Sequence, residues 1–248
     1  MLTEERLQEI LKLVEKKGSV SIQELMEELN ISESTARRDL TMLDAQGRLL
    51  KVRGGAIVRD DVYSAGEATM SQKQTLNLQE KRAIASYAAS LLEPDDFVFL
   101  DAGSTTELMI EYMTEKKVTF VTNAVSHAKK LSEAGYSTYI LGGEFKATTE
   151  AVVGDETIDS LQKYNFTKGF WGTNGVNTAI GFTTPDVKEA MVKKAAMKHC
   201  AKRYVVCDSS KFSQISCVKF ADFANANIIT TNLTDRKYDE YDNVVQVY

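Results

Sequence analysis

The sequence predicts an α/β protein in two unequal parts, a small helical domain that ends in a β-hairpin and a larger domain built on a mainly parallel sheet. Three observations predict this class. Residues 1–59 contain three short helical patterns and a glycine-centred hairpin, residues 60–79 are polar without a sustained apolar period, and residues 80–248 alternate helical with strand patterns. The chain has 248 residues, of which 43% are hydrophobic, so it can bury two unequal cores. We therefore expect an N-terminal domain at 1–59, an interdomain linker at 60–79 and a second domain at 80–248.

The N-terminal domain is predicted from three amphipathic runs. Apolar residues recur at helical spacing within residues 7–14, 22–29 and 36–43, and Ser21 and Ser32 stand where the second and third helices need N-caps. The link "NIS" at 30–32 is short enough to hold those two helices at a steep angle. The following "GRLLKVRGGAIV" has two apolar-bearing runs around a Gly-Gly pair, which is typical of a β-hairpin. Together these features predict a winged helix-turn-helix.

Charge and helical phase indicate that this domain binds double-stranded DNA. The whole chain has a net charge of −5, but residues 31–59 hold six basic against three acidic side chains. On the third helix Ser34, Arg38 and Thr41 point away from the apolar side, and we expect Arg38 to contact guanine. Arg53, in the hairpin, is expected on phosphate or in the minor groove. The predicted DNA-binding residues are Ser32, Ser34, Thr35, Arg37, Arg38, Thr41 and Arg53. The alternative interpretation is a solvated helix face on a protein-binding adaptor.

The second domain is predicted from alternating elements. Helical patterns cover residues 84–92, 107–113, 125–134, 154–161 and 186–199. Strand patterns lie at 96–100, 118–122, 137–141, 168–173, 203–208, 227–231 and 244–248. This alternation favours a mainly parallel sheet covered by helices on both faces.

Polar turns follow five of the predicted strands, at the edge where ligands bind in such sheets. In "LDAGSTTE" a glycine, three hydroxyls and the N–H groups of a starting helix predict a phosphate site. We expect Gly103, Ser104, Thr105 and Thr106 to bind the phosphate, with Lys211 of "DSSK" supplying positive charge. Asp101, Asn123, Asn174 and Asp208 are expected to bind sugar hydroxyls, and Gly175 belongs to the same edge in "GTNG".

Several motifs resemble one family of regulators. "SESTARRDL" and "VRGGA" in the first domain, and "EKRAIASYAASLL", "FLDAGSTT", "VTNA", "LGGEF", "GTNG" and "DSSKF" in the second, are similar to the DeoR family of bacterial transcriptional regulators. The opening "MLTEER" resembles most the fructose-operon regulators of that family. The resemblance implies a repressor released by a phosphorylated sugar, with fructose 1-phosphate as the expected effector. It also implies a second domain like ribose-5-phosphate isomerases and glucosamine-6-phosphate deaminases in fold.

The resemblance also implies which residues bind the effector. It maps family effector residues onto Lys81, Asp208 and Lys211, while Lys73 stands where the family more often has arginine and retains the positive charge. Because one winged helix makes few base contacts, the protein is expected to bind operator DNA as a homodimer or homotetramer.

An enzyme of the sugar-phosphate isomerase or deaminase type is the second hypothesis. Such chemistry needs a positioned base, and Asp101, Asp208 and Glu189 remain candidates. His127 and His199 fall in helical patterns, where packing or solvent exposure is expected, and Lys193-Lys194 is interpreted as the solvated side of an amphipathic helix. No pair of residues compels catalysis, so we expect a sensor that is not an enzyme.

Composition sets the remaining expectations. No apolar run approaches the ~20 residues of a membrane span, so a cytoplasmic protein without a membrane partner is expected. Cys200, Cys207 and Cys217 have spacings unlike a zinc site, so we expect reduced, mostly buried thiols. We expect neither cofactor nor metal.

Overall fold

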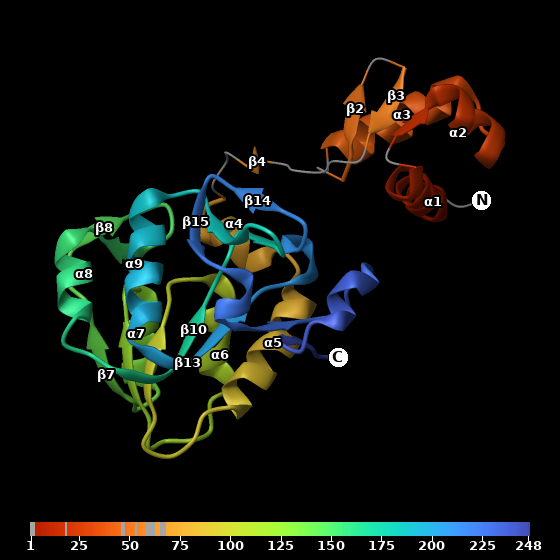
Figure 1. The fold of residues 1–248 in the computed structure, drawn as a ribbon. Helices are drawn as coiled ribbons and strands as arrows, with labels where there is room; N and C mark the ends of the chain where they lie inside the picture. The colour runs from red at the N-terminus through yellow and green to blue at the C-terminus, as the bar shows by residue number, and fades with distance from the viewer. Residues whose placement is uncertain (1–2, 18, 46–47, 53, 58–62, 65–67) are drawn as a thin grey trace. The chain divides into compact units, whose positions relative to one another are not determined.

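A computed structural model describes residues 3–17, 19–45, 48–52, 54–57, 63–64 and 68–248 (Figure 1). The chain divides into two compact units, Met1–Val62 and Tyr63–Tyr248, and each is described by itself. In the described part of the chain no helix is both long and apolar enough to cross a membrane.

The smaller unit has the winged arrangement that the sequence predicted. Its elements are α1 (Thr3–Lys17), β1 (Ser19–Ser21), α2 (Ile22–Leu29), α3 (Glu33–Ala45), β2 (Leu50–Val52) and β3 (Gly55–Ile57). The three strands form an antiparallel sheet in the order β1-β3-β2. The apolar residues of the three helical runs meet in one core, in which Ile10, Leu25 and Leu40 are completely buried. Hydrophobic periodicity therefore predicted the inward face of each helix correctly.

Caps and one ion pair fix the helices of this unit. The Ser21 hydroxyl accepts from the Glu24 N–H at 3.1 Å, and the Glu24 carboxylate accepts from the Ser21 N–H at 2.8 Å, which completes a capping box at the start of α2. Arg6 of α1 donates to both carboxylate oxygens of Asp39 on α3, at 2.6 and 3.2 Å. Asp39 is 1% exposed, so this bidentate pair joins two helices at the edge of the core.

The larger unit is built on a seven-stranded sheet in the order β17-β16-β13-β10-β5-β6-β7, and every pairing in it is parallel. Its strands are β5 (Phe97–Leu100), β6 (Thr119–Thr122), β7 (Ser137–Ile140), β10 (Phe166–Trp171), β13 (Cys200–Val206), β16 (Asn227–Thr230) and β17 (Val244–Gln246). The helices are α4 (Met70–Thr75), α5 (Leu78–Ser90), α6 (Ser104–Tyr112), α7 (Val125–Glu133), α8 (Asp155–Leu161) and α9 (Val187–Lys198). The predicted parallel sheet is therefore confirmed.

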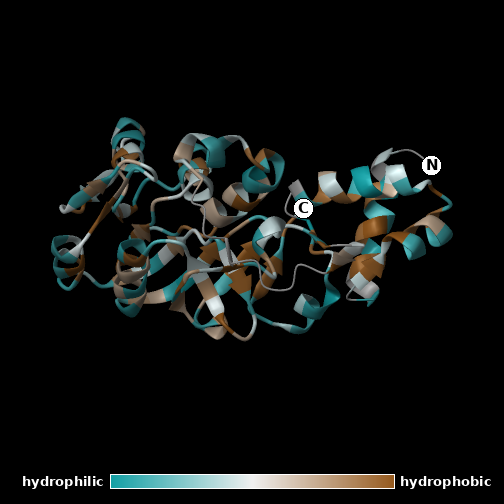
Figure 2. Ribbon diagram, turned by 90° about the horizontal axis from the view of Figure 1, so that it is seen from above, coloured by the Kyte–Doolittle hydropathy of each residue, from teal (hydrophilic) through white to brown (hydrophobic). Residues whose placement is uncertain are grey.

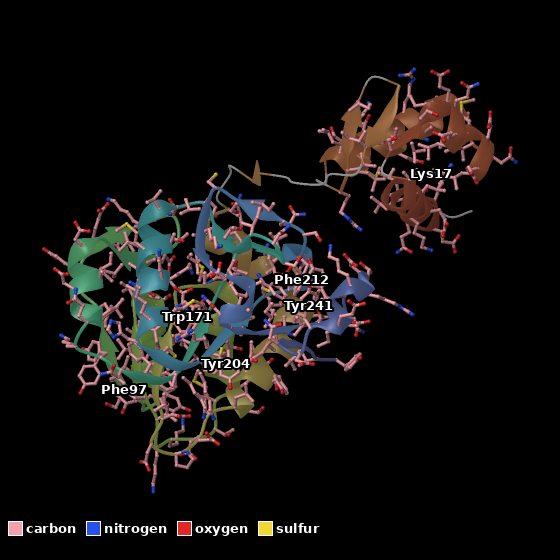
Figure 3. The ribbon with its side chains drawn as sticks, viewed as in Figure 1. Lys17, Phe97, Trp171, Tyr204, Phe212 and Tyr241 are labelled. Carbon is pink, nitrogen blue, oxygen red and sulfur yellow. The ribbon has the colours of Figure 1, made fainter. Side chains whose placement is uncertain are left out.

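Two hydrophobic clusters separate the faces of this sheet. Val98 and Leu100 of β5 pack with residues of α5, α6 and α7, whereas Phe99 between them packs with residues of α8 and α9. Alternate residues of a strand point to opposite faces, which explains the division. Figure 2 shows hydrophobic residues gathered along the strands of the sheet. Trp171 of β10, labelled in Figure 3, is the single tryptophan of the chain and is completely buried.

Short antiparallel additions were not predicted from the sequence. They are the hairpin of β8 (Glu144–Lys146) with β9 (Ala151–Val153), and the sheet of β11 (Gly175–Asn177), β12 (Gly181–Thr184) and β15 (Val218–Ala221). In addition, β14 (Ile215–Ser216) pairs in parallel with β4 (Tyr63–Ser64). Single-turn 3-10 helices span Ser209–Lys211 and Phe223–Asn225, and a longer one spans Arg236–Glu240.

The segment expected as a linker, residues 60–79, contributes structure to the larger unit. Helix α4 lies within it, and the Met70 N–H at its start donates to the Thr148 carbonyl at 3.0 Å. The Met70 side chain is 3% exposed, so α4 is anchored on the larger unit. Its six residues are too few to show an apolar period, which is why no helix was predicted there.

Candidate nucleic-acid interface and ligand site

The outward side of α3 carries the predicted DNA-binding residues. The Ser32 hydroxyl accepts from the Thr35 N–H at 3.3 Å and so caps α3, as predicted. Ser34, Arg38 and Thr41 are exposed, and no residue in the described part of the chain forms an ion pair with Arg38. Arg38 can therefore extend toward a partner without giving up a contact within the protein. Arg53 lies outside the described residues.

A lysine of the hairpin joins this surface. The Thr41 hydroxyl donates to the Arg37 carbonyl at 2.7 Å and accepts from the Lys51 ammonium at 2.6 Å. Arg37 itself is paired with Glu33 one turn earlier, at 2.6 Å. Sequence reasoning passed over Lys51, because its strand assignment alone did not show that its side chain reaches α3. The geometry adds Lys51 of β2 to the basic groups on this face.

The larger sheet has its topological switch point between β5 and β10. From β5 the chain runs outward to β6 and β7, whereas β10, β13, β16 and β17 extend on the other side. Crevices at the carboxyl ends of strands at such a point are where α/β sheets bind ligands. Asp101 directly follows β5, and its carboxylate accepts from the Gly172 N–H, after β10, at 3.0 Å.

Lys193 of α9 bridges the two segments that follow β5 and β10 at this switch point. Its ammonium donates to the Asp101 carboxylate and to the Gly172 carbonyl, the latter at 3.2 Å. Burial raises the pKa of Asp101, and the Lys193 ammonium and the Gly172 N–H oppose that rise. The sequence-based interpretation of Lys193 as a solvated residue was wrong, because its side chain is 6% exposed. Its neighbour Lys194 is exposed, as expected.

The N-terminus of α6 begins directly after Asp101, in the predicted phosphate turn. No side chain in the described part of the chain caps this helix, whose first bonded N–H is that of Glu107, donating to the Gly103 carbonyl at 2.9 Å. The N–H groups of Ser104 and Thr105, in the first turn, therefore have no acceptor within the helix and lie at the positive end of its dipole. The Thr106 hydroxyl turns inward, donating to the Asp101 carbonyl at 2.7 Å and contacting the His127 ring. Thr106 is completely buried, and both contacts of its hydroxyl lie within the protein.

Lys81 of α5 lies against this turn. Its ammonium donates to the Ser104 hydroxyl at 3.0 Å and to the Lys73 carbonyl, and the residue is 4% exposed. Burial lowers the pKa of Lys81, Asp208 opposes this, and the charges of Lys211 and Lys73 lower it further. Two other predicted cationic residues, Lys73 and Lys211, are thus within electrostatic reach of Lys81.

The turn after β13 is held to α5 by residues that sequence reasoning missed. Asp208 is 2% exposed and accepts from the Asn77 amide at 2.9 Å and the Ser210 N–H at 3.2 Å. The Glu80 carboxylate accepts from the Ser209 N–H at 2.8 Å. Asn77 and Glu80 lie four residues and one residue before Lys81. Their closeness in sequence to a predicted effector residue is the feature that could have identified them. They position Asp208 and Lys211 next to Lys81.

The remaining predicted site residues take supporting positions. The Asn123 amide accepts from the Ala102 N–H at 3.1 Å and donates to the Val152 carbonyl at 3.3 Å, so it ties the turn after β5 to β9. The Asn174 amide oxygen accepts from the Thr184 hydroxyl at 3.3 Å. Gly175 lies against backbone, and an added Cβ would stand 2.4 Å from the Gln214 carbonyl oxygen. A close approach of two backbone segments thus explains glycine at this position.

Two other titratable residues are built into the larger unit. Glu189, a candidate base in the sequence analysis, is 8% exposed and accepts from the Thr149 hydroxyl at 2.5 Å and from Lys146 at 3.2 Å. Burial lowers the pKa of His127 to about 4, and the ring is completely buried, in agreement with the predicted packing role. His199 lies at the C-cap of α9. In the described residues no group of His, Cys, Asp and Glu could hold a metal ion.

Family models match both units. The DeoR-like helix-turn-helix domain matches residues 6–62, and the DeoR C terminal sensor domain matches residues 76–233. The chain belongs to the DeoR family. The resemblance seen in "SESTARRDL" and in the strand-end motifs is thereby confirmed for a chain that carries both the DNA-binding and the sensor domain of these transcriptional regulators.

Curated relatives match this DeoR-family chain over nearly its full length. The uncharacterized HTH-type transcriptional regulator FruR of Bacillus subtilis is 45% identical over 97% of this chain and 96% of its own. The lactose phosphotransferase system repressor of Staphylococcus aureus is 35% identical over 98% of this chain and 96% of its own. Among solved structures, ribose 5-phosphate isomerase A of Neisseria gonorrhoeae is 17% identical, with a TM-score of 0.42 over 58% of this chain and 55% of that one. The sorbitol operon regulator SorC of Klebsiella pneumoniae is 11% identical, with a TM-score of 0.39 over 83% and 88%.

Proposed function

We propose that this DeoR-family regulator represses a sugar-utilisation operon in the cytoplasm and leaves its operator when a phosphorylated sugar, fructose 1-phosphate, fills the sensor domain. Support for the sugar comes from the FruR relative and from the motif resemblance to fructose-operon regulators. Support for a repressor comes from the lactose phosphotransferase system repressors that match over nearly the whole chain.

The observation that carries the proposal is the environment of Lys81. Of the residues that the structure describes, three lysines are buried. Lys168 is paired with Glu93 and Asp96, at 2.5 and 2.6 Å, and Lys193 is paired with Asp101. Lys81 is bonded to a hydroxyl and a carbonyl, both neutral, at an uncapped helix N-terminus. The Asp208 charge opposes the lowering of the Lys81 pKa but is not bonded to this ammonium, and a ligand phosphate would give the buried cation a bonded anion.

Each part of the ligand has matching groups. The phosphate would accept from the backbone N–H groups of Gly103, Ser104, Thr105 and Thr106, with Lys81 and Lys211 as cations and Lys73 nearby. Asp101, Asn123, Asn174 and Asp208 would face the sugar hydroxyls from neighbouring strand ends. Asp101, being held by Lys193 and Gly172, would offer its carboxylate in a fixed orientation.

The proposed DNA binding is supported by the exposed residues of α3. Arg38 would read guanine, while Ser32, Ser34, Thr35, Arg37, Thr41 and Arg53 would contact bases or phosphates, with Lys51 reinforcing the positive charge. Because one small domain reads few base pairs, a homodimer or homotetramer would bind repeated half-sites.

Helix α4 offers a path from the ligand to the connection with the DNA-binding domain. Its Lys73 carbonyl accepts from Lys81, and its Gln74 amide donates to Glu107 in the first turn of α6 at 2.8 Å. A phosphate that engages the Lys81 ammonium would compete with the Lys73 carbonyl and loosen one of these two ties. Effector and DNA would thus favour different positions of α4, and their coupling would be reciprocal.

The test is fluorescence anisotropy of DNA from upstream of the protein's own gene, titrated with full-length protein at fixed salt. Fructose 1-phosphate is expected to release the DNA, whereas fructose 6-phosphate, fructose and inorganic phosphate are not. Lys81→Gln is expected to keep DNA affinity and lose release, while Lys129→Gln, which removes an exposed charge on α7, is expected to behave like the parent. DNA binding that no phosphosugar weakens would contradict the sensor assignment.

A parallel assay separates sensing from catalysis. Turnover of fructose 1-phosphate or fructose 6-phosphate by the full chain, abolished by Asp101→Asn with binding retained, would favour the isomerase-type hypothesis. We expect binding without turnover, because Asp101 is ion-paired with Lys193 and so is poorly suited to act as a base.

A further inference from the structure

A cavity of the sensor unit is lined by none of the residues of the proposed effector site. It has a volume of about 390 Å³ and is lined chiefly by Lys194, Met197 and Lys198 of α9, by Arg203 of β13, and by Lys219 and Phe220 of β15. Helix α9 contributes residues both to this cavity and to the switch point at Asp101. Lys193 turns toward Asp101, whereas Lys194 and Lys198 line this cavity, which we name the basic pocket.

The basic pocket concentrates positive charge on an acidic protein. The chain has a net charge of −5, yet four cationic side chains line this pocket against one carboxylate, Asp222. Asp222 pairs with Lys219 at 2.5 Å, and no residue in the described part of the chain forms an ion pair with Lys194, Lys198 or Arg203. Three like charges that converge without an acidic partner repel one another, and an anion in the pocket would relieve that repulsion.

The cations form two groups on opposite elements. Lys194 and Lys198 are one helical turn apart on the same side of α9. Arg203 and Lys219 come from the strands, and the Arg203 guanidinium is oriented by donating to the Cys200 carbonyl at 3.0 Å and the Asn225 carbonyl at 3.5 Å. An oriented guanidinium loses little freedom when it binds a phosphate, which favours recognition by the strand group.

Two buried apolar side chains line the same pocket. Met197 and Phe220 are 5% and 3% exposed, and both line the pocket. The Lys193 ammonium lies 5.7 Å from the centre of the Phe220 ring, so this ring stands between the pocket and the ion pair at the switch point. A ligand in the pocket would therefore rest its carbon skeleton on buried side chains while its charged ends meet cations.

We propose that the basic pocket binds a small bisphosphorylated metabolite, a carbon skeleton of about monosaccharide size with a phosphate at each end. One phosphate would be bound by Lys194 and Lys198, and the other by Arg203 and Lys219. The cavity volume lies within the range that holds small organic ligands. This assignment does not depend on the proposed effector or on DNA binding.

The test is isothermal titration calorimetry of the full-length protein with fructose 1,6-bisphosphate as the probe. Titrations are made on the parent protein and on Lys81→Gln, in which the proposed effector site is weakened. The double variant Lys194→Gln/Lys198→Gln removes two exposed charges, and Lys129→Gln/Lys163→Gln removes two exposed charges elsewhere as a matched control. We expect saturable binding that survives in Lys81→Gln and in the control, weakens roughly ten-fold or more in Lys194→Gln/Lys198→Gln, and falls as salt rises.

Three results would overturn the assignment. The first is absence of saturable binding to the parent at millimolar probe, and the second is equal affinity in Lys194→Gln/Lys198→Gln. The third is loss of binding in Lys81→Gln alone, which would place the probe in the effector site. The two-phosphate ligand itself predicts that inorganic phosphate binds more weakly than the probe. Sedimentation of the same variants gives a further check, because a lower mass for Lys194→Gln/Lys198→Gln would identify the basic pocket as a contact between subunits.

Discussion

Replacing Lys193 with methionine tests the ion pair at the switch point. The Lys193 and Asp101 side chains are 6% and 2% exposed, so each charge is compensated by the other rather than by water. After Lys193→Met the Asp101 carboxylate keeps one bonded donor, the Gly172 N–H at 3.0 Å. Removing one partner of a buried ion pair costs about 3–5 kcal/mol, because the remaining charge stays buried and uncompensated.

Urea unfolding followed by Trp171 fluorescence measures this cost. Trp171 is the single tryptophan and immediately precedes Gly172, so its signal reports the unit that contains the pair. With a urea dependence of about 2–3 kcal/mol per molar, the unfolding midpoint is expected to fall by roughly 1–2 M. Lys194→Met is the matched control, because the neighbouring side chain is exposed and its loss should change the free energy of unfolding by less than about 0.5 kcal/mol.

A double-mutant cycle makes the result specific to the pair. Asp101→Asn together with Lys193→Met leaves no uncompensated charge, so the double variant should lose less stability than the sum of the single variants. Equal small losses for Lys193→Met and Lys194→Met, or strictly additive effects in the cycle, would refute the argument that these two charges support each other.

Three further outcomes are expected. His127 has a pKa of about 4 in the folded protein, below its ordinary 6.5, so the unfolded state takes up the proton first as pH falls. The free energy of unfolding should therefore drop by up to about 3 kcal/mol between pH 6.5 and 4, and chemical denaturation at several pH values should show a flatter dependence for His127→Gln. Gly55→Ala would put a Cβ 2.2 Å from a backbone carbonyl oxygen and should destabilise the smaller unit by about 2 kcal/mol, whereas Gly142→Ala, with nothing within 4 Å, should not alter the thermal melt. Arg38→Ala should weaken operator binding in anisotropy by about ten-fold or more at fixed salt, and Lys12→Ala, an exposed change on α1, should not.

Periodic patterns predicted most of the architecture. The three helices of the smaller unit and the seven parallel strands of the larger one were all anticipated, because apolar periods marked the helices and apolar runs alternating with helical patterns marked the strands. The short strands of the larger unit outside its main sheet, such as β8, β9 and β14, were missed. These strands form where tertiary structure provides a partner, and they lie outside the alternation of strand and helix from which the main sheet was predicted.

Functional residues were predictable where backbone geometry alone places them. Asp101, Asn123 and Asp208 each follow a parallel strand, so the sheet topology brings them to one edge. Asn77 and Lys51 were missed, because their contributions depend on where a side chain ends after packing. The site roles of the predicted residues stay predictions until the ligand and DNA experiments are made.

Lys193 and Lys194 show what a helical pattern leaves undecided. Successive residues on a helix point about 100° apart, so two adjacent lysines cannot share one environment when the helix packs on a sheet. Which of them turns inward depends on an acceptor in the sheet, and Asp101 at the end of β5 supplies it. A pattern of charged residues on one helix contains no information about a carboxylate 92 residues earlier in the chain. On the same helix Lys193 therefore pairs with Asp101 at the switch point, whereas Lys194 lines the basic pocket, the proposed site of the bisphosphorylated ligand.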